Sequence, residues 1–333
     1  MRRRTGSTME RRDFLRSLAV ASLLGADRVA HGQQTTPERE ATAGMADDGK
    51  KVQWELMLPH EMDASLAECP TAFVPLGTLE WHGFQNALGL DALKAHALCV
   101  RTARTSGGVV LPPLYGGMGG VSEPHTVVME PEDSVRSCIV EPWVRALLSE
   151  LKRNGFKAAI VLTGHYGASQ QMMVRETAVR ETQRLGIPVL GTPEYFLAMD
   201  AGYMGDHGGR FETSLLMALR PELVDISQLT GDPPYKGIGG GDPQRESSAE
   251  EGERVSAAIV ERLATLARRM PQWDAATVGA FLRAEQALVS DQLERSARDG
   301  NVWAAWRDLS RYVPYGELLA AERFEEIRRL ATE

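Results

Sequence analysis

The sequence KAAIVLTGHYG at residues 157–167 contains the clearest strand of the chain and the loop that follows it. Its uninterrupted run of apolar residues is typical of a strand that is buried on both faces. A helix is expected after the loop, from about residue 169 to residue 185, and a further strand is expected at 187–190. Strands that alternate with helices in this way predict a parallel sheet with helices on both faces.

The same alternation is present earlier in the chain. Residues 71–77, TAFVPLG, and residues 109–111 are predicted strands, and a helix is expected between them at 91–105. A second helix is expected from Pro131 to about residue 154. We expect a kink or break in it at Pro142, because proline lacks the N–H group that a helix interior requires.

Residues beyond 270 have a different character, with helix-like segments and no strand pattern. We therefore predict an α/β fold, a three-layer α/β/α sandwich with a mostly parallel sheet, followed by a C-terminal helical extension. The predicted domain occupies residues 51–268, and the extension occupies residues 269–333. The extension is expected to pack on the core or on a neighbouring subunit.

The first 32 residues are interpreted as a targeting signal. Arg11 and Arg12 precede an apolar run at 18–24, and this pattern resembles a twin-arginine export signal. The run is too short to span a bilayer, so no stable membrane anchor is expected. Residues 33–50 have no apolar period and are predicted to be a flexible spacer. The protein is expected to be periplasmic or secreted, unless residues 1–32 are only a basic, disordered tail.

The composition is that of an ordinary soluble globular protein, with 43% hydrophobic and 25% charged residues. The formal net charge of −8 at pH 7 gives no support to nucleic-acid binding, because phosphate backbones attract basic surfaces. The charge and composition therefore favour a small-molecule partner over a nucleic acid.

Acidic and imidazole side chains follow two of the predicted strands. Glu80 and His82 lie two residues apart, so both point the same way in an extended segment, and Asp91 follows shortly after them. His165 follows the strand at 157–162. Because sites in open α/β sheets form beyond the carboxyl ends of the strands, we expect these residues to meet at one edge.

Carboxylate and imidazole ligands of this kind suit zinc, manganese or iron. Each residue taken alone also has a simpler interpretation. Asp91 suits a helix cap, Glu80 and His82 could be ordinary loop residues, and His165 could be a structural histidine.

A second cluster has the sequence DHGGRFETS at residues 206–214. It offers an acid and a base, Asp206 and His207, and a further carboxylate, Glu212. If the cluster is only structural, a helix begins near Leu215 and Glu212 favours it through the helix dipole. Combined with the earlier residues, Glu212 becomes a candidate metal ligand.

These motifs, taken in order, resemble the creatininase (creatinine amidohydrolase) family. The resemblance depends on PLGTLEWHG at 75–83 with Asp91, on GHYG at 164–167 and on the cluster at 206–214. A late glycine motif, GDP at 241–243, is similar as well. The resemblance implies a layered α/β/α fold, an oligomer that is often hexameric, and hydrolysis of non-peptide amides, including cyclic amides and formamides, with two divalent metal ions.

The resemblance also assigns roles to individual residues. It implies that Glu80, His82, Asp91 and His165 are metal ligands, with Asp91 bridging the two ions. His207 lies at the position of the family's catalytic histidine.

The chain departs from true creatininases at several positions. Gly167 occupies the position of a family glutamate two residues after the histidine, so Glu212 becomes the candidate ligand for the second metal. Trp81 replaces a common glutamine, and the segment 84–86 lacks a frequent second histidine. These departures argue against creatinine itself as the substrate.

We therefore predict a metal-dependent hydrolase that cleaves a non-peptide amide C–N bond with a water activated by two divalent ions, zinc, manganese or iron. His207 is expected to protonate the leaving nitrogen, with Asp206 orienting it. Trp81, His125 and Tyr166 are candidate substrate contacts. The expected partners are a small-molecule amide and other copies of the chain in a homo-oligomer.

Two other functions stay open. The chain could be an exported small-molecule-binding protein with this fold that has lost hydrolytic activity, an interpretation that Gly167 encourages. It could also be a structural protein that uses its acidic surface and helical extension to bind partners.

Overall fold

Residues 50–132 and 137–331 are described in the computed structural model of the chain. The predicted export signal at residues 1–32 and nearly all of the predicted spacer at 33–50 lie outside these described residues. Within the described ranges, no helix has both the length and the apolar character needed to cross a membrane.

A five-stranded sheet forms the centre of the fold, and its pairings are all parallel. The strand order is β2-β1-β4-β5, and β3 pairs with the end of β1. Phe73 of β1 lies opposite Ile160 of β4, so the carboxyl ends of these two strands meet at one edge. The strands are β1 (Thr71–Gly77), β2 (Val109–Val110), β3 (Leu114–Tyr115), β4 (Ala158–Thr163) and β5 (Val189–Pro193).

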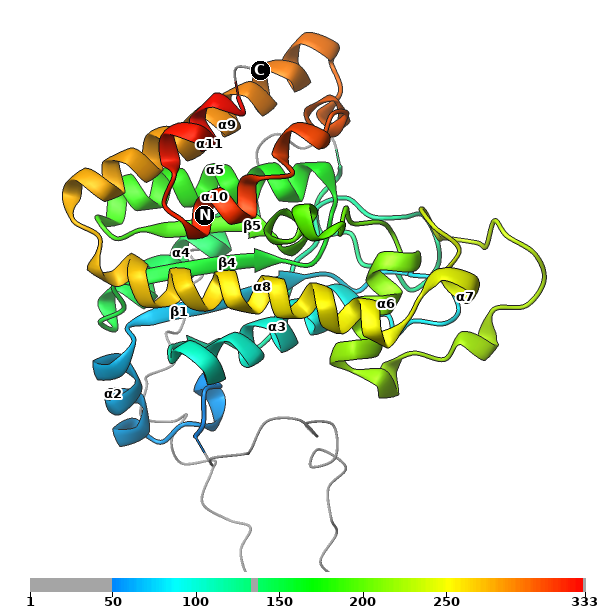
Figure 1. The fold of residues 1–333 in the computed structure, drawn as a ribbon, viewed down its shortest axis with the longest axis horizontal. Helices are drawn as coiled ribbons and strands as arrows, with labels where there is room; N and C mark the ends of the chain where they lie inside the picture. The colour runs from blue at the N-terminus through cyan, green and yellow to red at the C-terminus, as the bar shows by residue number, and fades with distance from the viewer. Residues whose placement is uncertain (1–49, 133–136, 332–333) are drawn as a thin grey trace, which may run out of the picture. The chain divides into compact units, whose positions relative to one another are not determined.

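Helices cover both faces of the sheet, which confirms the predicted three-layer α/β/α sandwich. Alternate strand residues point to opposite faces. Phe73 and Ile160 belong to one buried cluster, which includes side chains of α3 (Leu90–Ser106) and α8 (Ala249–Arg269). Val74 belongs to the other cluster, with side chains of α4 (Val140–Arg153) and α5 (Ala168–Leu185). Figure 1 shows α8 running along the strands.

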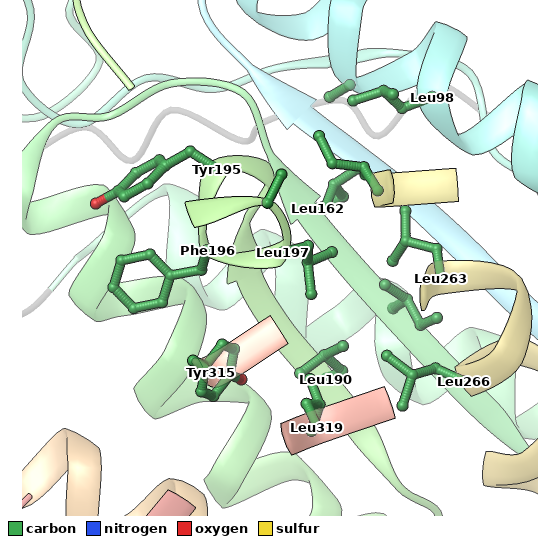
Figure 2. Packing of buried hydrophobic residues seen from close by; sticks show 14 of the residues in the cluster. Leu98, Leu162, Leu190, Tyr195, Phe196, Leu197, Leu263, Leu266, Tyr315 and Leu319 are labelled. Carbon is green, nitrogen blue, oxygen red and sulfur yellow. The ribbon is translucent and has the colours of Figure 1, made fainter. Parts of the chain in front are cut away.

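The first cluster is the larger part of the core. Figure 2 shows Leu162 and Leu190 of the sheet close to Leu263 of α8 and to Leu319 near the end of the chain. Full burial of each such side chain stabilises the fold by about 1.5–3 kcal/mol. The core therefore joins the sheet to the C-terminal region.

The C-terminal region is helical, as predicted, and packs on the core of its own chain. Arg175 of α5 is fully buried, and its guanidinium group lies 3.0 Å from the carboxylate of Glu285 on α9. The hydroxyl of Tyr315 donates a 2.8 Å hydrogen bond to the same carboxylate. Figure 1 shows α9 (Ala275–Asp299) beside α5.

The remaining helices are short. The α-helices are α2 (Pro59–Glu68), α6 (Arg210–Leu219), α7 (Pro243–Glu246), α10 (Tyr315–Ala320) and α11 (Phe324–Arg329). The 3-10 segments are η2 (Trp54–Leu56), η3 (Glu194–Leu197), η4 (Met199–Ala201), η5 (Pro221–Leu223), η6 (Ile226–Gln228), η7 (Met270–Gln272), η8 (Val302–Trp306) and η9 (Ser310–Tyr312).

The helix predicted to start at Pro131 begins later, at Val140, so that prediction was wrong. The carboxylate of Glu130 accepts hydrogen bonds of 3.1 Å from the backbone N–H groups of Ile139 and Val140 and thereby caps α4. Pro142 lies in the first turn, where a missing N–H group costs no helical hydrogen bond. The helix is therefore continuous past Pro142, and the predicted break does not occur.

The helix predicted near Leu215 begins earlier, at Arg210. The carboxylate of Asp206 accepts hydrogen bonds from the backbone N–H groups of Phe211 (2.7 Å) and Glu212 (3.0 Å) and extends α6 by a turn. Glu212 therefore lies in the first turn of a helix rather than in the preceding loop.

Two glycines bring the start of α3 against the ends of neighbouring strands. A Cβ atom on Gly77 would lie 2.3 Å from the backbone nitrogen of Ala92, and one on Gly164 would lie 2.1 Å from the carbonyl oxygen of Asp91. Only a residue without a side chain permits this approach. The first turn of α3, with Asp91, consequently lies directly at the carboxyl edge of the sheet.

Candidate metal centre

The five predicted metal ligands converge at the carboxyl edge of the sheet. Each is buried, with an exposed fraction between 1% and 3%. Buried carboxylates are rare unless a positive charge compensates them. The ligands are Glu80 and His82 after β1, Asp91 in the first turn of α3, His165 after β4, and Glu212 in the first turn of α6.

Asp91 joins two groups of candidate ligands. His165 Nδ1 lies 2.9 Å from Glu80 Oε2 and 3.2 Å from Asp91 Oδ2. On the other side, His82 Nε2 lies 3.0 Å from Asp91 Oδ1 and 3.4 Å from Glu212 Oε2. The ligand atoms within each group lie within 4.8 Å of one another. One carboxylate thus offers a different oxygen to each of two adjacent sites.

Backbone carbonyls determine which nitrogen of each histidine is free. His82 Nδ1 lies 3.1 Å from the carbonyl oxygen of Glu80, and His165 Nε2 lies 3.1 Å from that of Met118. A carbonyl only accepts hydrogen bonds, so these nitrogens carry the protons. The lone pairs of His82 Nε2 and His165 Nδ1 therefore face the carboxylates, which is the arrangement of metal-binding histidines.

The carboxylates fit the same interpretation. Glu80 Oε2 and both side-chain oxygens of Asp91 are buried and accept no hydrogen bond from the described residues. Oxygen atoms of this kind, facing imidazole lone pairs, are stable only when a proton or a cation lies between them. The donor set of oxygen and nitrogen atoms suits zinc or manganese.

The electrostatics of the protein without metal point the same way. Burial alone would lower the pKa of His82, but the nearby carboxylates of Asp91 and Glu212 outweigh it and raise the pKa to about 9. Burial also opposes protonation of His165, yet the charge of Glu80 raises its pKa. The site therefore attracts positive charge strongly enough to overcome desolvation.

A buried lysine adjoins the second group. The ammonium group of Lys94, on α3, forms ion pairs with Glu212 and, at 3.0 Å, with Glu194. It also lies 4.0 Å from the ring centroid of Tyr166, whose hydroxyl donates a 2.6 Å hydrogen bond to Glu194. These contacts hold one oxygen of Glu212 away from the candidate site and leave the other directed toward His82.

His207 and Asp206, the predicted catalytic pair, have different surroundings. His207 Nε2 donates a 2.8 Å hydrogen bond to the carbonyl of Trp81, so Nδ1 is free to accept a proton. The ring of His207 lies 4.2 Å from that of His82, and burial together with His82 lowers the pKa of His207. Glu80, His82 and His207 also form a third potential ligand group.

Asp206 caps α6 with its carboxylate, as described above, and lines the same cavity as His207. Burial and the neighbouring charge of Glu212 raise the pKa of Asp206 to about 7. The Asp206 carboxylate therefore has two positions to satisfy: it caps the start of α6 and it also faces the cavity.

A cavity of about 910 Å³ lies over the first ligand group. Tyr166, one of the three predicted substrate contacts, lines it together with Glu80, His165 and His207. Trp81 and His125, the other predicted contacts, are not among the lining residues. Their rings stack on each other with centroids 6.3 Å apart.

Sequence reasoning missed Lys94 and Glu194, although each carried a signal. Lys94 lies three residues after Asp91 and so shares a helix face with it. Glu194 directly follows β5, at the same edge of the sheet as the other ligands. Treating every polar residue at this edge as a candidate would have found Glu194.

Comparison with known proteins gives a consistent result. A family model described as creatininase, creatinine amidohydrolase, matches residues 55–267. A creatinine amidohydrolase from Pseudomonas putida is 29% identical over 202 residues, which cover 53% of this chain and 74% of that protein.

Solved structures agree with the family model. A crystal structure of creatinine amidohydrolase aligns with a TM-score of 0.55 and 26% identity, covering 67% of this chain and 99% of that one. Structures described as "Creatininase Mn" and as a mutant creatininase of "Zn-Zn type" also align with TM-scores of 0.55, at 27% identity. They cover 67% of this chain and 100% and 99% of their own chains. The chain belongs to the creatininase family.

Proposed function

We propose that this protein hydrolyses a non-peptide amide C–N bond, of the cyclic amide or formamide type, and that it does so with two divalent cations. The observation that supports the proposal best is the position of Asp91, whose two oxygens face different histidines. Glu80 and His165 would hold one cation with Asp91, and His82 and Glu212 would hold the other. When bound, such cations supply Lewis acidity toward an amide carbonyl and an attacking water.

Zinc and manganese are the proposed metals. The related structures are described as a Zn-Zn type and as a manganese creatininase. Both metals accept the mixed carboxylate and imidazole ligands found here. Glu212 takes the role that a glutamate at position 167 would otherwise have, since Gly167 offers no side chain.

His207 is proposed to move the proton that amide hydrolysis requires. Its Nε2 is occupied by the carbonyl of Trp81, so Nδ1 accepts a proton from water and delivers it to the leaving nitrogen. The hydrogen bond to Trp81 holds the neutral ring in the tautomer that carries its proton on Nε2, both before and after the transfer. Asp206 holds the start of α6, so its contribution is to keep the segment with His207 in position.

The test combines metal analysis with an amide panel. Purified protein loaded with zinc or manganese is assayed for ring opening of creatinine and hydantoin and for aniline release from formanilide. His207→Gln is expected to keep its metal content and to lose turnover by about 10²–10⁴-fold, the usual contribution of a general acid–base group. His60→Gln, at an exposed position on α2, is the matched control and should behave like wild type.

The outcomes separate the proposal from its alternative. Full turnover by His207→Gln would exclude the proposed proton transfer. Metal binding without hydrolysis of any amide, combined with tight binding of a small amide, would instead support an exported binding protein that has lost activity. Wild-type protein that binds no metal after reconstitution would exclude both.

Two further proposals concern export and assembly. We propose export through the twin-arginine pathway, supported by Arg11 and Arg12 and the apolar run after them. Replacing both arginines with lysine should retain the protein in the cytoplasm, as cell fractionation would show. We also propose a homo-oligomer, which sedimentation equilibrium tests directly.

A further inference from the structure

The C-terminal region contributes one wall of the cavity over the candidate metal centre. Four side chains on and after η8 line it, and we name them the C-terminal wall: Trp303, Trp306, Arg307 and Leu309. The family model ends at residue 267, so the whole wall lies outside the part of the chain that matches the family.

The C-terminal wall is firmly attached to the core. Trp306 is only 6% exposed, and its ring packs at 5.9 Å, edge to face, on Phe196. The side chain of Asn301 accepts a 2.9 Å hydrogen bond from the backbone N–H of Trp303 and caps η8. Arg307 lies 2.5 Å from Asp299 at the end of α9. These contacts give the wall a defined position relative to the sheet.

Trp303 is an exception within this packed segment, because 48% of its surface is exposed. An indole ring left open to a cavity is a large apolar surface that a flat ligand can cover. Tyr166, Tyr195 and Met204 line the cavity as well, so apolar and aromatic surface extends from the wall toward the ligands.

Charge is distributed unevenly over the cavity. Arg307 is the only lysine or arginine among its lining residues in the described part of the chain, whereas Glu123 and Glu132 also line it. One of the five N–H groups of Arg307 is directed to Asp299, which leaves donors for a second carboxylate. An anionic group on a ligand is therefore favoured at Arg307 and repelled near the two glutamates.

We propose that the C-terminal wall selects an amide that carries a flat aromatic or heteroaromatic ring with a carboxylate substituent. The ring stacks on Trp303, the carboxylate pairs with Arg307, and the amide then extends toward His165 and His207. This inference rests on the proposed function. The cavity volume supports this inference. At about 910 Å³ it lies near the upper end of the volumes of pockets that bind drug-sized ligands, which are much larger than creatinine.

The probe is 4-formamidobenzoate, whose hydrolysis breaks the C–N bond and releases formate and 4-aminobenzoate. Its neutral analogue is N-(4-methylphenyl)formamide, and the small reference is N-methylformamide. Trp303→Ala should lower the ratio of kcat/KM for either aromatic formamide to that for N-methylformamide by at least tenfold. Arg307→Gln should lower the ratio of the anionic to the neutral aromatic probe by a similar factor.

Matched controls remove one residue of the same type outside the cavity. Trp143→Ala replaces a half-exposed tryptophan on α4, and Arg298→Gln replaces an arginine that also pairs with Asp299. Both ratios should stay at the wild-type value in these controls. Ratios that are unchanged in Trp303→Ala and Arg307→Gln would overturn the proposal.

A binding measurement keeps this proposal separate from the proposed function. Calorimetry with 4-aminobenzoate should show binding that weakens at least tenfold in Trp303→Ala and Arg307→Gln but not in the controls. If no amide is hydrolysed and this pattern still holds, the C-terminal wall is a ligand site and only the hydrolase proposal fails. If amides are hydrolysed but 4-aminobenzoate does not bind, the wall proposal fails alone.

Discussion

The ammonium group of Lys94 forms a fully buried ion pair with the carboxylate of Glu212. The same ammonium group lies 3.0 Å from Glu194, so one positive charge serves two buried carboxylates. Glu212 thus divides its oxygens between a lysine and the candidate metal centre, where its other oxygen faces His82. This arrangement connects the second ligand group to the charge balance of the core.

Lys94→Met should lower the free energy of unfolding by about 3–5 kcal/mol, because it leaves buried carboxylates without their partner. Thermal unfolding of the metal-free protein would measure this. Adding zinc should restore part of the loss, since a cation can compensate Glu212 but not Glu194. Lys157→Met, at an exposed position, is the control and should be nearly neutral. Equal melting temperatures for Lys94→Met and the control would contradict this account.

Substitution of single candidate ligands should lower the number of metal ions bound per chain, by an amount that depends on the ligand. Of the two ligand groups that share Asp91, Glu80→Gln affects one and Glu212→Gln affects the other, so each variant should retain about one ion per chain if wild type binds the proposed two. Asp91→Asn, which affects both groups, should retain almost none. Elemental analysis after dialysis gives the numbers, with Glu123→Gln, a cavity residue outside the ligand groups, as control. Full metal content in Asp91→Asn would rule out a bridging carboxylate.

Gly167→Ala should damage the site although it adds only a methyl group. A Cβ atom there would lie 2.4 Å from the carbonyl oxygen of Met118 and 2.8 Å from His165 Nε2, which donates to that carbonyl. Overpacking of this kind costs about 1–3 kcal/mol, and here it displaces a ligand as well. Stability and metal content should both fall.

The comparison for Gly167→Ala is Gly279→Ala on α9, where a Cβ atom would meet only the end of the Arg283 side chain at 3.4 Å. That substitution should be neutral, or stabilising by up to about 1 kcal/mol, because alanine favours a helix interior. For the same steric reason, Gly167→Glu should not install the family glutamate. Gain of metal affinity in Gly167→Glu would show that the backbone can move away.

The stability of the fold should depend on pH through Asp200. Burial would raise the pKa of Asp200, but Arg262 on α8, which holds the carboxylate at 2.6 Å, outweighs burial and lowers it. A carboxylate with a lowered folded-state pKa stabilises the protein above its unfolded pKa of about 4 and loses that effect as the pH falls through the folded value. The contribution should be about 1 kcal/mol.

Asp200→Asn should therefore be less stable than wild type at pH 7, and the difference should disappear once the pH falls below the lowered folded-state pKa of Asp200. Urea titrations at several pH values test this. Asp63→Asn, at an exposed position on α2, should show a smaller difference at pH 7. A difference between Asp200→Asn and wild type that persists in acid would show that the lost contact is not ionic.

Local pattern was enough to predict the sheet and the position of the ligands. The strands at 71–77 and 157–162 are apolar and end in polar loops, and the parallel rule then places Glu80, His82 and His165 at one edge. The start of α4 was not predictable in this way, because its cap comes from Glu130, several residues upstream. Pro131 and Glu132 resembled the first turn of a helix, but neither residue is helical.

Contacts between segments that are distant in the sequence could not be predicted from residue spacing. Lys94 and Glu212 are 118 residues apart, and each has an ordinary role when considered alone. The sequence indicated only that Trp303 belongs to a helical extension. Nothing in the neighbouring sequence indicates that it lines a cavity together with residues such as Glu80 and His165. These features depend on how the helices pack on the sheet, which the hydrophobic periodicity of the sequence does not determine.

The contacts at Gly77 and Gly164 have an evolutionary consequence. They join α3 to the sheet through main-chain atoms, so the spacing between Asp91 and the loops that carry Glu80 and His165 depends on these two positions remaining glycine. Substitutions at other positions can therefore accumulate without moving the first turn of α3 away from the candidate metal centre. A lineage with these two glycines is free to change the surfaces around the cavity while it inherits the candidate metal centre in the same position.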